Sequence, residues 1–228
     1  MASNIRIIYE DNHLLVVEKP VNVSSQEDDT GDPDILTILK EDIKQRYNKP
    51  GDVYLGLVHR LDRPVGGAMV FAKTSKAASR LSEQVRTRKF NKIYMAVVHG
   101  KLSNQRGSLK HHLLKDSRTN IVKAVPNTIE GAKEALLDYE VVEYINELSL
   151  LRVCLHTGRS HQIRVQFSTI GHPLYGDQKY GANINKPGQQ IALWSSEIGL
   201  IHPTQKVEMT FKCDPPKTSP WSLFTHLK

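Results

Sequence analysis

A single aspartate with arginines close on both sides is the group in this sequence best suited to acid–base or nucleophilic chemistry. Asp62 lies in the run His59-Arg60-Leu61-Asp62-Arg63-Pro64-Val65-Gly66-Gly67. We expect its carboxylate to be ionised, because nearby positive charge favours the charged form. The proline and the two glycines suit a turn, or the close approach of a ligand to the backbone. From the local chemistry alone, a structural turn with an Asp cap is the more common arrangement.

Three further side chains are placed where they could contact a substrate. Lys19 ends an apolar segment just before a proline, and Tyr94 lies in the strand-like run 92–100. Arg164 lies on a short predicted helix that begins after Ser160, and from there it can point toward a partner loop. Taken alone, Lys19 equally fits an ordinary lysine at a strand end. Tyr94 alone fits a half-buried strand tyrosine with a satisfied hydroxyl.

The strands that must position these residues are predicted from short apolar and alternating runs. Strands at 53–58 and 68–72 flank Asp62, so the aspartate is expected in the loop between them. A strand pair at 5–9 and 14–18 precedes it. Further strands are expected at 92–100, 108–115, 121–125, 134–144, 148–155, 191–194 and 207–211.

Three helices are predicted from the spacing of apolar residues and from capping side chains. The first is expected from Pro33 to about Tyr47 with Asp32 as its cap. The second is expected to begin at Thr74 or Ser75. The third is expected after Ser160 as its N-cap, and its buried face would consist of Ile163, Phe167 and Ile170.

Composition and charge narrow the classes of partner. The chain has 228 residues, 39% of them hydrophobic, and a formal net charge of +7, which suits a globular protein that binds a polyanion. No apolar run approaches the ~20 residues of a membrane span. Residues 1–4 lead directly into strand-like sequence, so no targeting segment is expected. Cys154 and Cys213 show no metal-binding spacing, which suits a reducing cytoplasm.

Residues 101–123 form the most basic segment of the chain. The segment is expected to form a hairpin that follows the phosphates of a polyanion, with Lys110 and Lys115 among its cations. A solvated charged face and a metal site at His111-His112 are the alternatives. The hairpin is favoured over the metal site, because adjacent strand residues point to opposite faces and no third ligand stands at a fitting distance.

Four separated segments resemble motifs of one enzyme family, in the same order along the chain. The run His59-Arg60-Leu61-Asp62, followed by a glycine-containing turn, resembles the catalytic motif of the RluA family of pseudouridine synthases. Val65-Gly66 stands where the family usually has Thr-Ser, a departure that concerns substrate contacts rather than the aspartate. The resemblance extends over about residues 9–211. Its other segments are Tyr9 to Pro20, Lys92 to Gly100, and Thr157 to Arg164 with its continuation Gly171 to Gly181.

The resemblance implies a single α+β domain spanning residues 1–228, built on a curved, mostly antiparallel mixed sheet with flanking helices and a central basic cleft. It implies an isomerase that converts a specific uridine in structured ribosomal or transfer RNA to pseudouridine, without metal or organic cofactor. No room is left before Ile5 for the S4-type RNA-binding domain that the family often carries. We therefore expect a stand-alone cytoplasmic monomer that acts on RNA, with no membrane or protein partner implied.

The resemblance also implies roles for individual residues. Asp62 would be the catalytic carboxylate, Arg164 its ion-pair partner, and Tyr94 the residue that packs against the uracil. Whether Asp62 acts as nucleophile or as base is left open. Substrate contacts are expected from a further set of mostly basic residues: Lys19, His59, Arg60, Arg63, Lys110, Lys115, Arg159 and His161.

Two alternative functions belong to other classes. One is an N-glycosidic hydrolase, since a carboxylate could also cleave that bond with water as acceptor. Such a mechanism normally uses a second carboxylate, and no motif supplies one beside Asp62. The other is an RNA-binding module without activity, which the presence of Asp62, Tyr94 and Arg164 argues against.

Overall fold

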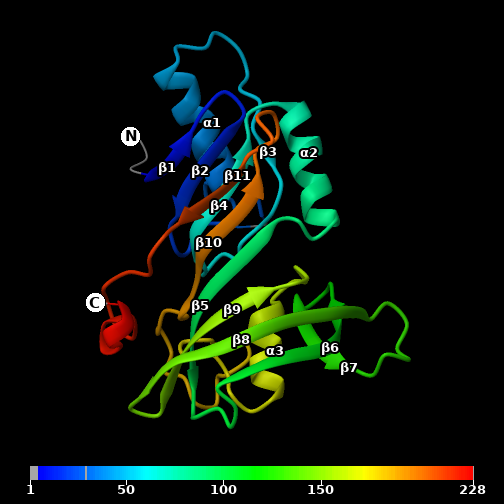
Figure 1. Cartoon of the computed structure of the whole chain (residues 1–228), viewed down its shortest axis with the longest axis vertical. Coiled ribbons are helices and arrows are strands. Elements are labelled where there is room, and N and C mark those ends of the chain that lie inside the picture. Colours follow the sequence, from blue (N-terminus) through cyan, green and yellow to red (C-terminus); the bar gives the residue numbers. More distant parts are fainter. Residues whose placement is uncertain (1–4, 29, 228) are drawn as a thin grey trace. The chain divides into compact units, whose positions relative to one another are not determined.

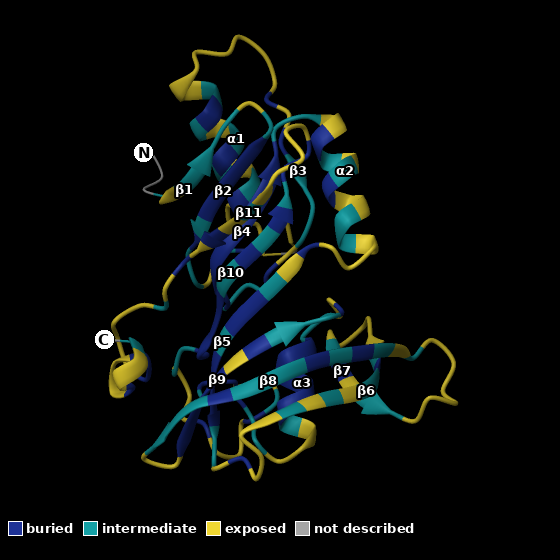
Figure 2. Cartoon of the chain, in the orientation of Figure 1, coloured by how far each residue is buried: buried dark blue, intermediate teal, exposed yellow. Residues whose placement is uncertain are grey.

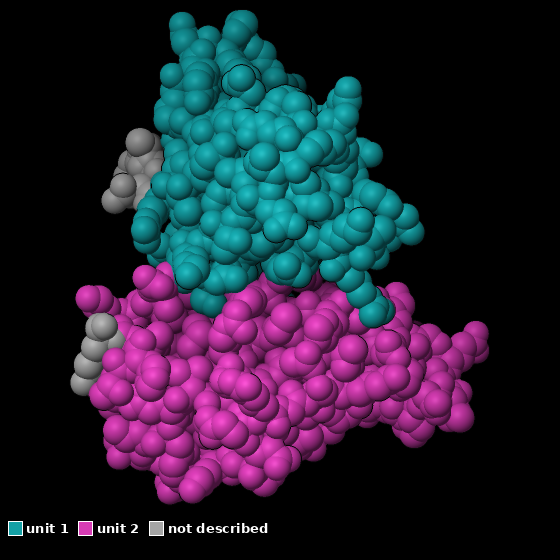
Figure 3. All heavy atoms as spheres, viewed as in Figure 1, with its two compact units in different colours: residues 1–91, 195–213 teal, residues 92–194, 214–228 magenta. Residues whose placement is uncertain are grey.

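The computed structural model describes residues 5–28 and 30–227, and it divides the chain into two compact units (Figure 3). Unit 1 comprises residues 1–91 and 195–213, and unit 2 comprises residues 92–194 and 214–228. The expectation that no targeting segment precedes the first strand concerns residues 1–4, which lie outside the described residues.

Unit 1 is built on a sheet whose strands follow the spatial order β1-β2-β4-β10 (Figure 1). β2 pairs antiparallel with both β1 and β4, while β3 adds to β4 and β11 adds to β10, also antiparallel. β2 and β4 read as nearly unbroken apolar runs because they are buried almost throughout (Figure 2). The strands are β1 (Ile7–Glu10), β2 (Leu14–Lys19), β3 (Gly56–Leu57), β4 (Gly66–Ala72), β10 (Leu193–Ile201) and β11 (Glu208–Lys212).

The strand predicted at 53–58 is reduced to the two residues of β3. Val53 and Leu55 are buried although they lie outside any strand. Their apolar character therefore reflects burial rather than sheet pairing, a distinction that a short apolar run does not encode.

Both helices of unit 1 form where they were predicted, with one correction to their caps. α1 (Ile35–Arg46) is capped by Asp34, which accepts a hydrogen bond from Thr37 N at 3.1 Å. The prediction of Asp32 as the cap was wrong, because the carboxylate of Asp32 binds Arg63 instead. α2 (Ser75–Arg86) is capped by Thr74, as predicted.

The tight approach of two strands explains one of the glycines that follow Asp62. Gly67 has φ +113°, and a Cβ atom built on it would lie 2.3 Å from the backbone oxygen of Ser195 in β10. The glycine thus accommodates the protein's own backbone, and no ligand is needed to explain it.

Replacing Gly67 with alanine should destabilise the protein by about 2–5 kcal/mol, because the backbone angle is unfavourable for alanine and the methyl group overlaps β10. Chemical unfolding of the variant measures this loss. Gly51→Ala is the matched control, because nothing lies within 4 Å of its added Cβ. Equal stability of the two variants would contradict the explanation.

Unit 2 is a five-stranded antiparallel sheet in the order β5-β9-β8-β6-β7. The strands predicted at 92–100, 108–115, 121–125, 134–144 and 148–155 form, whereas the one predicted at 191–194 begins at Leu193 and continues to Ile201 as β10. Helix α3 (Gln162–Thr169) lies against β6 and β8. Two short 3₁₀ helices follow the last strand of unit 1, η1 (Trp221–Leu223) and η2 (Thr225–Leu227). Trp221 of η1 and Phe224, between the two helices, are buried. The strands are β5 (Asn91–His99), β6 (Arg106–Asp116), β7 (Ile121–Val125), β8 (Lys133–Ile145) and β9 (Leu148–Leu155).

The start of α3 differs from the prediction. Its N-cap residue is His161 in a left-handed conformation (φ 51°), without a capping side chain, so the assignment of Ser160 as the cap was wrong. The preceding loop is held instead by Gln162, whose Oε1 accepts from Arg159 N at 3.0 Å and from Thr157 Oγ1 at 2.7 Å. Ile163 and Phe167 are buried as predicted, whereas Ile170 lies beyond the helix and is 37% exposed.

The α+β class and the mostly antiparallel sheet with helices beside it are confirmed. The single domain spanning residues 1–228 and the central basic cleft stay predictions. Among the described residues, no helix has both the length and the apolar character needed to span a membrane.

Candidate active site

Asp62 lies in the loop of unit 1 between β3 and β4, with a buried residue on each side of the turn. Leu61 is 5% exposed and Val65 is 2% exposed, so both anchor the loop in the core. Asp62 itself is partly exposed, and its carbonyl oxygen accepts from Val65 N at 2.9 Å to close the turn. The side chain of Arg60 is exposed to solvent. The loop is therefore a fixed backbone that presents a carboxylate and a cation.

Lys19 is a completely buried lysine that connects β2 to the Asp62 loop. Its Nζ donates to the carbonyl oxygens of Pro20 (2.8 Å), Val23 (2.5 Å) and Arg63 (3.2 Å). Burial lowers the pKa of Lys19 to about 7, although the negative charge of Asp62 opposes this change. Lys19 thus links the end of β2 to the Asp62 loop by hydrogen bonds, and its amino group interacts electrostatically with Asp62. A direct contact with substrate stays a prediction.

Arg63 and His59 also have partners within unit 1. The Arg63 guanidinium donates to Thr30 Oγ1 at 2.9 Å and to the carboxylate of Asp32. His59 Nε2 accepts from Val70 N at 2.9 Å, and the ring packs against Phe90 with 5.3 Å between centroids. These contacts give both side chains a role in holding the loop, and their predicted contacts with RNA stay predictions.

Arg164 forms a buried ion pair within unit 2. Its Nε and Nη2 atoms donate to the two oxygens of Asp177, each at 2.8 Å, and the side chains are 7% and 0% exposed. The guanidinium also lies over the ring of Tyr180, 5.2 Å from its centroid. Asp177 was not predicted as a partner; the only signal was its place in the motif-like segment Gly171 to Gly181.

Tyr94 and α3 lie on the same face of the unit 2 sheet. Tyr94 on β5 is opposite Val153 on β9, which in turn is opposite Tyr139 on β8. The ring of Tyr139 meets Phe167 of α3 edge-on, with 5.7 Å between centroids. Because residues opposite each other on neighbouring strands share a face, Tyr94 shares its face with the helix that carries Arg164. The Tyr94 side chain is buried, with 6% exposure.

Two further predicted residues hold the loop that leads into α3. His161 Nδ1 lies 2.6 Å from the hydroxyl of Tyr180, which accepts from Val122 N at 3.0 Å. Arg159 is exposed, and its Nε donates to the carbonyl oxygen of Glu134 at 2.9 Å. His161 is therefore hydrogen-bonded to Tyr180 at the start of α3, while Arg159 keeps part of its side chain at the surface.

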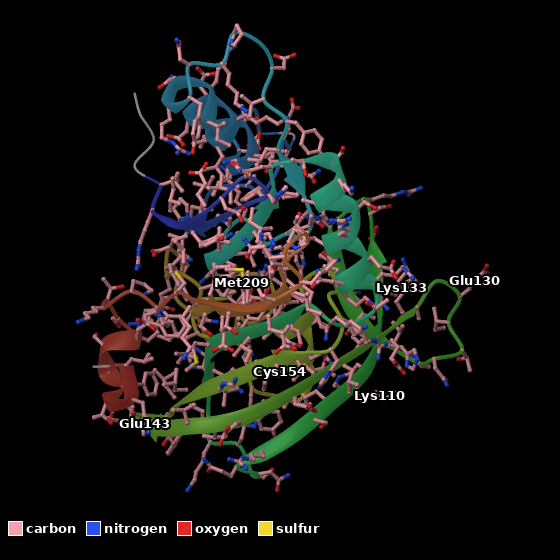
Figure 4. All side chains as sticks on the ribbon, turned by 45° about the horizontal axis from the view of Figure 1, so that its top comes forward. Lys110, Glu130, Lys133, Glu143, Cys154 and Met209 are labelled. Atoms are coloured by element: carbon pink, nitrogen blue, oxygen red, sulfur yellow. The ribbon has the colours of Figure 1, made fainter. Side chains whose placement is uncertain are left out.

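The predicted basic hairpin is formed by β6, β7 and the turn between them, residues 106–125. Lys110 is 63% exposed and forms an ion pair with Glu134 at 3.0 Å, and its place on β6 can be followed in Figure 4. Lys115 lies further along the same strand and is exposed. His111, by contrast, lies against Gln166 of α3 at 3.1 Å, and burial lowers the pKa of its imidazole. Within residues 5–28 and 30–227 no group of three His, Cys, Asp or Glu side chains is placed to hold a metal ion.

The predicted site residues thus fall into two groups. Lys19, His59, Arg60, Asp62 and Arg63 belong to unit 1, whereas Tyr94, Lys110, Lys115, Arg159, His161 and Arg164 belong to unit 2. Within unit 1, Lys19 donates a hydrogen bond to the carbonyl oxygen of Arg63, so these two predicted residues meet. The predicted pair of Asp62 with Arg164 joins residues of different units and stays a prediction.

Sequence comparison identifies relatives over most of the chain. The family model for RNA pseudouridylate synthase matches residues 13–169. The chain is 35% identical over 94% of its length to a protein of Aquifex aeolicus named an uncharacterized RNA pseudouridine synthase, and covers 70% of that protein. It is 32% identical over 96% of its length to the ribosomal large subunit pseudouridine synthase D of Pseudomonas aeruginosa, and covers 71% of it. For YhcT of Bacillus subtilis, named an uncharacterized RNA pseudouridine synthase, the values are 32%, 86% and 64%.

Solved structures share the fold. Human RNA pseudouridylate synthase domain containing 1 has a TM-score of 0.77 at 26% identity, over 98% of this chain and 88% of that one. Human RNA pseudouridylate synthase domain containing 4 has a TM-score of 0.78 at 23% identity, over 93% and 89% of the two chains. The second likeness concerns the fold alone.

Proposed function

This chain belongs to the RNA pseudouridylate synthase family, whose members are isomerases that act on RNA, and we propose that it converts a uridine in structured RNA to pseudouridine with Asp62 as the catalytic carboxylate. The observation that carries the proposal is the braced loop of unit 1, which presents Asp62 between buried residues within the segment matched by the family model. The names of the relatives favour ribosomal RNA, and transfer RNA is the alternative.

The reaction rearranges one nucleotide without adding or removing atoms overall. The bond between uracil N1 and ribose C1′ breaks, the base turns, and a bond forms between C5 and C1′. The proton on C5 is lost and a proton is taken up at N1. A base inside folded RNA must first leave its stack, at a cost of a few kcal/mol. The exposed Arg60 next to Asp62 is suited to occupy the vacated space.

Each catalytic residue has a task that its chemistry supports. Asp62 starts the cleavage at C1′ as nucleophile or as base. Arg164 would pair with the carboxylate of Asp62 and orient it toward C1′. Tyr94 would pack against the uracil.

The test uses RNA transcripts carrying tritium at C5 of uracil, incubated with the protein and then digested to nucleosides. The synthase releases tritium to water and leaves pseudouridine in the RNA. A hydrolase would instead leave free labelled uracil, and an RNA-binding module would leave the transcript unchanged. Either of the last two results would overturn the proposal.

The basic hairpin supplies a separate prediction about binding. Replacing Lys110 and Lys115 with glutamine should weaken the binding of all RNAs alike and make the plot of log affinity against log salt less steep by roughly one to two units, one for each phosphate lost. The ion pair of Lys110 with Glu134 is exposed and contributes little, so Lys110 can exchange it for a phosphate. The single-turnover rate at saturating RNA should stay within about twofold.

A charge-matched control separates local contact from net charge. Lys212 and Lys217 are exposed and lie outside the hairpin, so their double glutamine variant loses the same charge. Fluorescence anisotropy between low and moderate salt compares the two variants. If both show the same slope, the hairpin does not contact phosphates.

We also propose that the protein acts in the cytoplasm as a monomer. Cys154 and Cys213 are not joined in a disulfide, which supports a reducing compartment. Sedimentation of the purified protein, with and without RNA, tests the monomer.

A further inference from the structure

We propose that Ser25 is a positioning residue that fixes the backbone on the N-terminal side of Asp62, and so sets the direction in which the carboxylate reaches the ribose. This inference rests on the proposed function. Ser25 lies outside all the motifs described above, five residues after the motif-like segment that ends at Pro20.

The Ser25 hydroxyl binds both backbone groups of one residue. Its Oγ donates to the carbonyl oxygen of Leu61 at 2.7 Å and accepts from the N–H of Leu61 at 3.1 Å. The serine is 6% exposed, and Leu61 is 5% exposed. A hydroxyl has one donor and two acceptor positions, so this single side chain satisfies a donor and an acceptor that would otherwise be buried without a partner.

The C-terminal side of Asp62 is fixed from the same segment. Lys19 donates to the carbonyl oxygen of Arg63 at 3.2 Å, and Asp62 O accepts from Val65 N at 2.9 Å. Ser25 therefore holds the peptide group before Asp62, and Val65 holds the one after it. Lys19, about 40 positions away in the sequence, holds the next carbonyl group, that of Arg63. With both neighbours fixed, the backbone angles of Asp62 have little freedom, and its side chain leaves the loop in one direction.

The adjacent residue provides a matched control. Ser24 is also buried and hydrogen-bonded, but its hydroxyl donates to the carboxylate of Asp28 and its carbonyl oxygen accepts from Ile35 N at 2.9 Å. The two serines differ in what their hydroxyls hold: Ser24 holds a surface loop, and Ser25 holds the residue before Asp62.

Ser25→Ala should lower kcat roughly ten- to hundredfold, because a small misplacement of a reacting group costs about that much, while KM for RNA stays within about threefold. Ser24→Ala should keep kcat within about twofold of wild type. Ser25→Thr retains the hydroxyl and should recover most of the rate. Ser25→Cys keeps the shape with a weaker hydrogen bond and should fall between alanine and wild type.

A second measurement does not depend on activity. Exchange of the Leu61 amide hydrogen, followed by NMR, should be faster in Ser25→Ala than in wild type or Ser24→Ala, because that amide loses its acceptor. Thermal unfolding of all variants shows whether the rate effect exceeds any general loss of stability.

The outcomes separate this inference from the proposed function. If wild type leaves labelled uridine unchanged, the proposed function fails. If wild type forms pseudouridine and Ser25→Ala matches Ser24→Ala in kcat and in Leu61 exchange, the positioning role is overturned. A fall in kcat confined to Ser25→Ala and Ser25→Cys, with faster Leu61 exchange and recovery in Ser25→Thr, supports it.

Discussion

Asp62→Asn should abolish turnover, lowering the rate by roughly 10³-fold or more, while RNA affinity stays within a few-fold of wild type. The amide has nearly the same shape but is neither a nucleophile nor a base at C1′. A carboxylate that faces RNA adds repulsion rather than attraction to phosphate, so its loss should not weaken binding. Tritium release at saturating RNA and a separate binding titration measure the two effects.

The same change made elsewhere in unit 1 controls for a general effect. Asp52 is exposed, and Asp52→Asn should behave as wild type in both measurements. A loss of binding as large as the loss of rate in Asp62→Asn would instead identify Asp62 as a structural turn residue.

Arg164→Met should lower the free energy of unfolding by about 3–5 kcal/mol, because it leaves the carboxylate of Asp177 buried without its cation. Since whole proteins are stable by only about 5–15 kcal/mol, this loss alone would reduce the folded fraction under mild conditions. Urea unfolding measures it. The single variant therefore cannot distinguish a catalytic role from a structural one.

A double variant makes that distinction. Arg164→Met combined with Asp177→Asn removes both charges. The amide oxygen can still accept from the backbone N–H groups of Lys179 and Tyr180, so most of the stability should return. If Arg164 also pairs with Asp62, the double variant should still be slow at saturating RNA although it is folded. Normal turnover would show that Arg164 serves only the ion pair with Asp177.

Apolar periodicity predicts most of the elements because burial on one face leaves a local pattern. β5 to β9 and both helices of unit 1 appear where that pattern placed them. The caps were harder to predict, because several polar residues near a helix start can each serve. Asp32 and Asp34 both precede α1, and either could cap the helix. Asp34 does so because Asp32 forms an ion pair with Arg63, 31 positions away in the sequence.

The candidate site could be predicted only as far as its chemistry is local. Asp62 and its neighbouring arginines lie within four consecutive residues, so the local sequence alone identifies them as candidates. Asp177, Ser25 and the three carbonyl oxygens around Lys19 act through partners that are distant along the chain or belong to the backbone. Nothing in the identity of a lone serine or aspartate encodes such a partner. These contacts depend on tertiary packing, which brings the segments together.

The division of unit 1 into two stretches of chain has a consequence for synthesis. β10 is the neighbour of β4 in the sheet, yet about 120 residues separate Ala72 from Ser195. At about 5–20 residues per second, a ribosome needs roughly 6–25 s to produce the missing strand.

During that interval the edge of β4 that β10 later occupies has no partner, although β4 is among the most apolar strands of the chain. Residues 92–194 of unit 2 emerge in one piece and can pair their strands in the meantime. The nascent chain therefore carries an incomplete first unit next to a nearly complete second one. Until β10 is made, β4 thus presents an apolar strand edge of the kind that pairs readily with other chains.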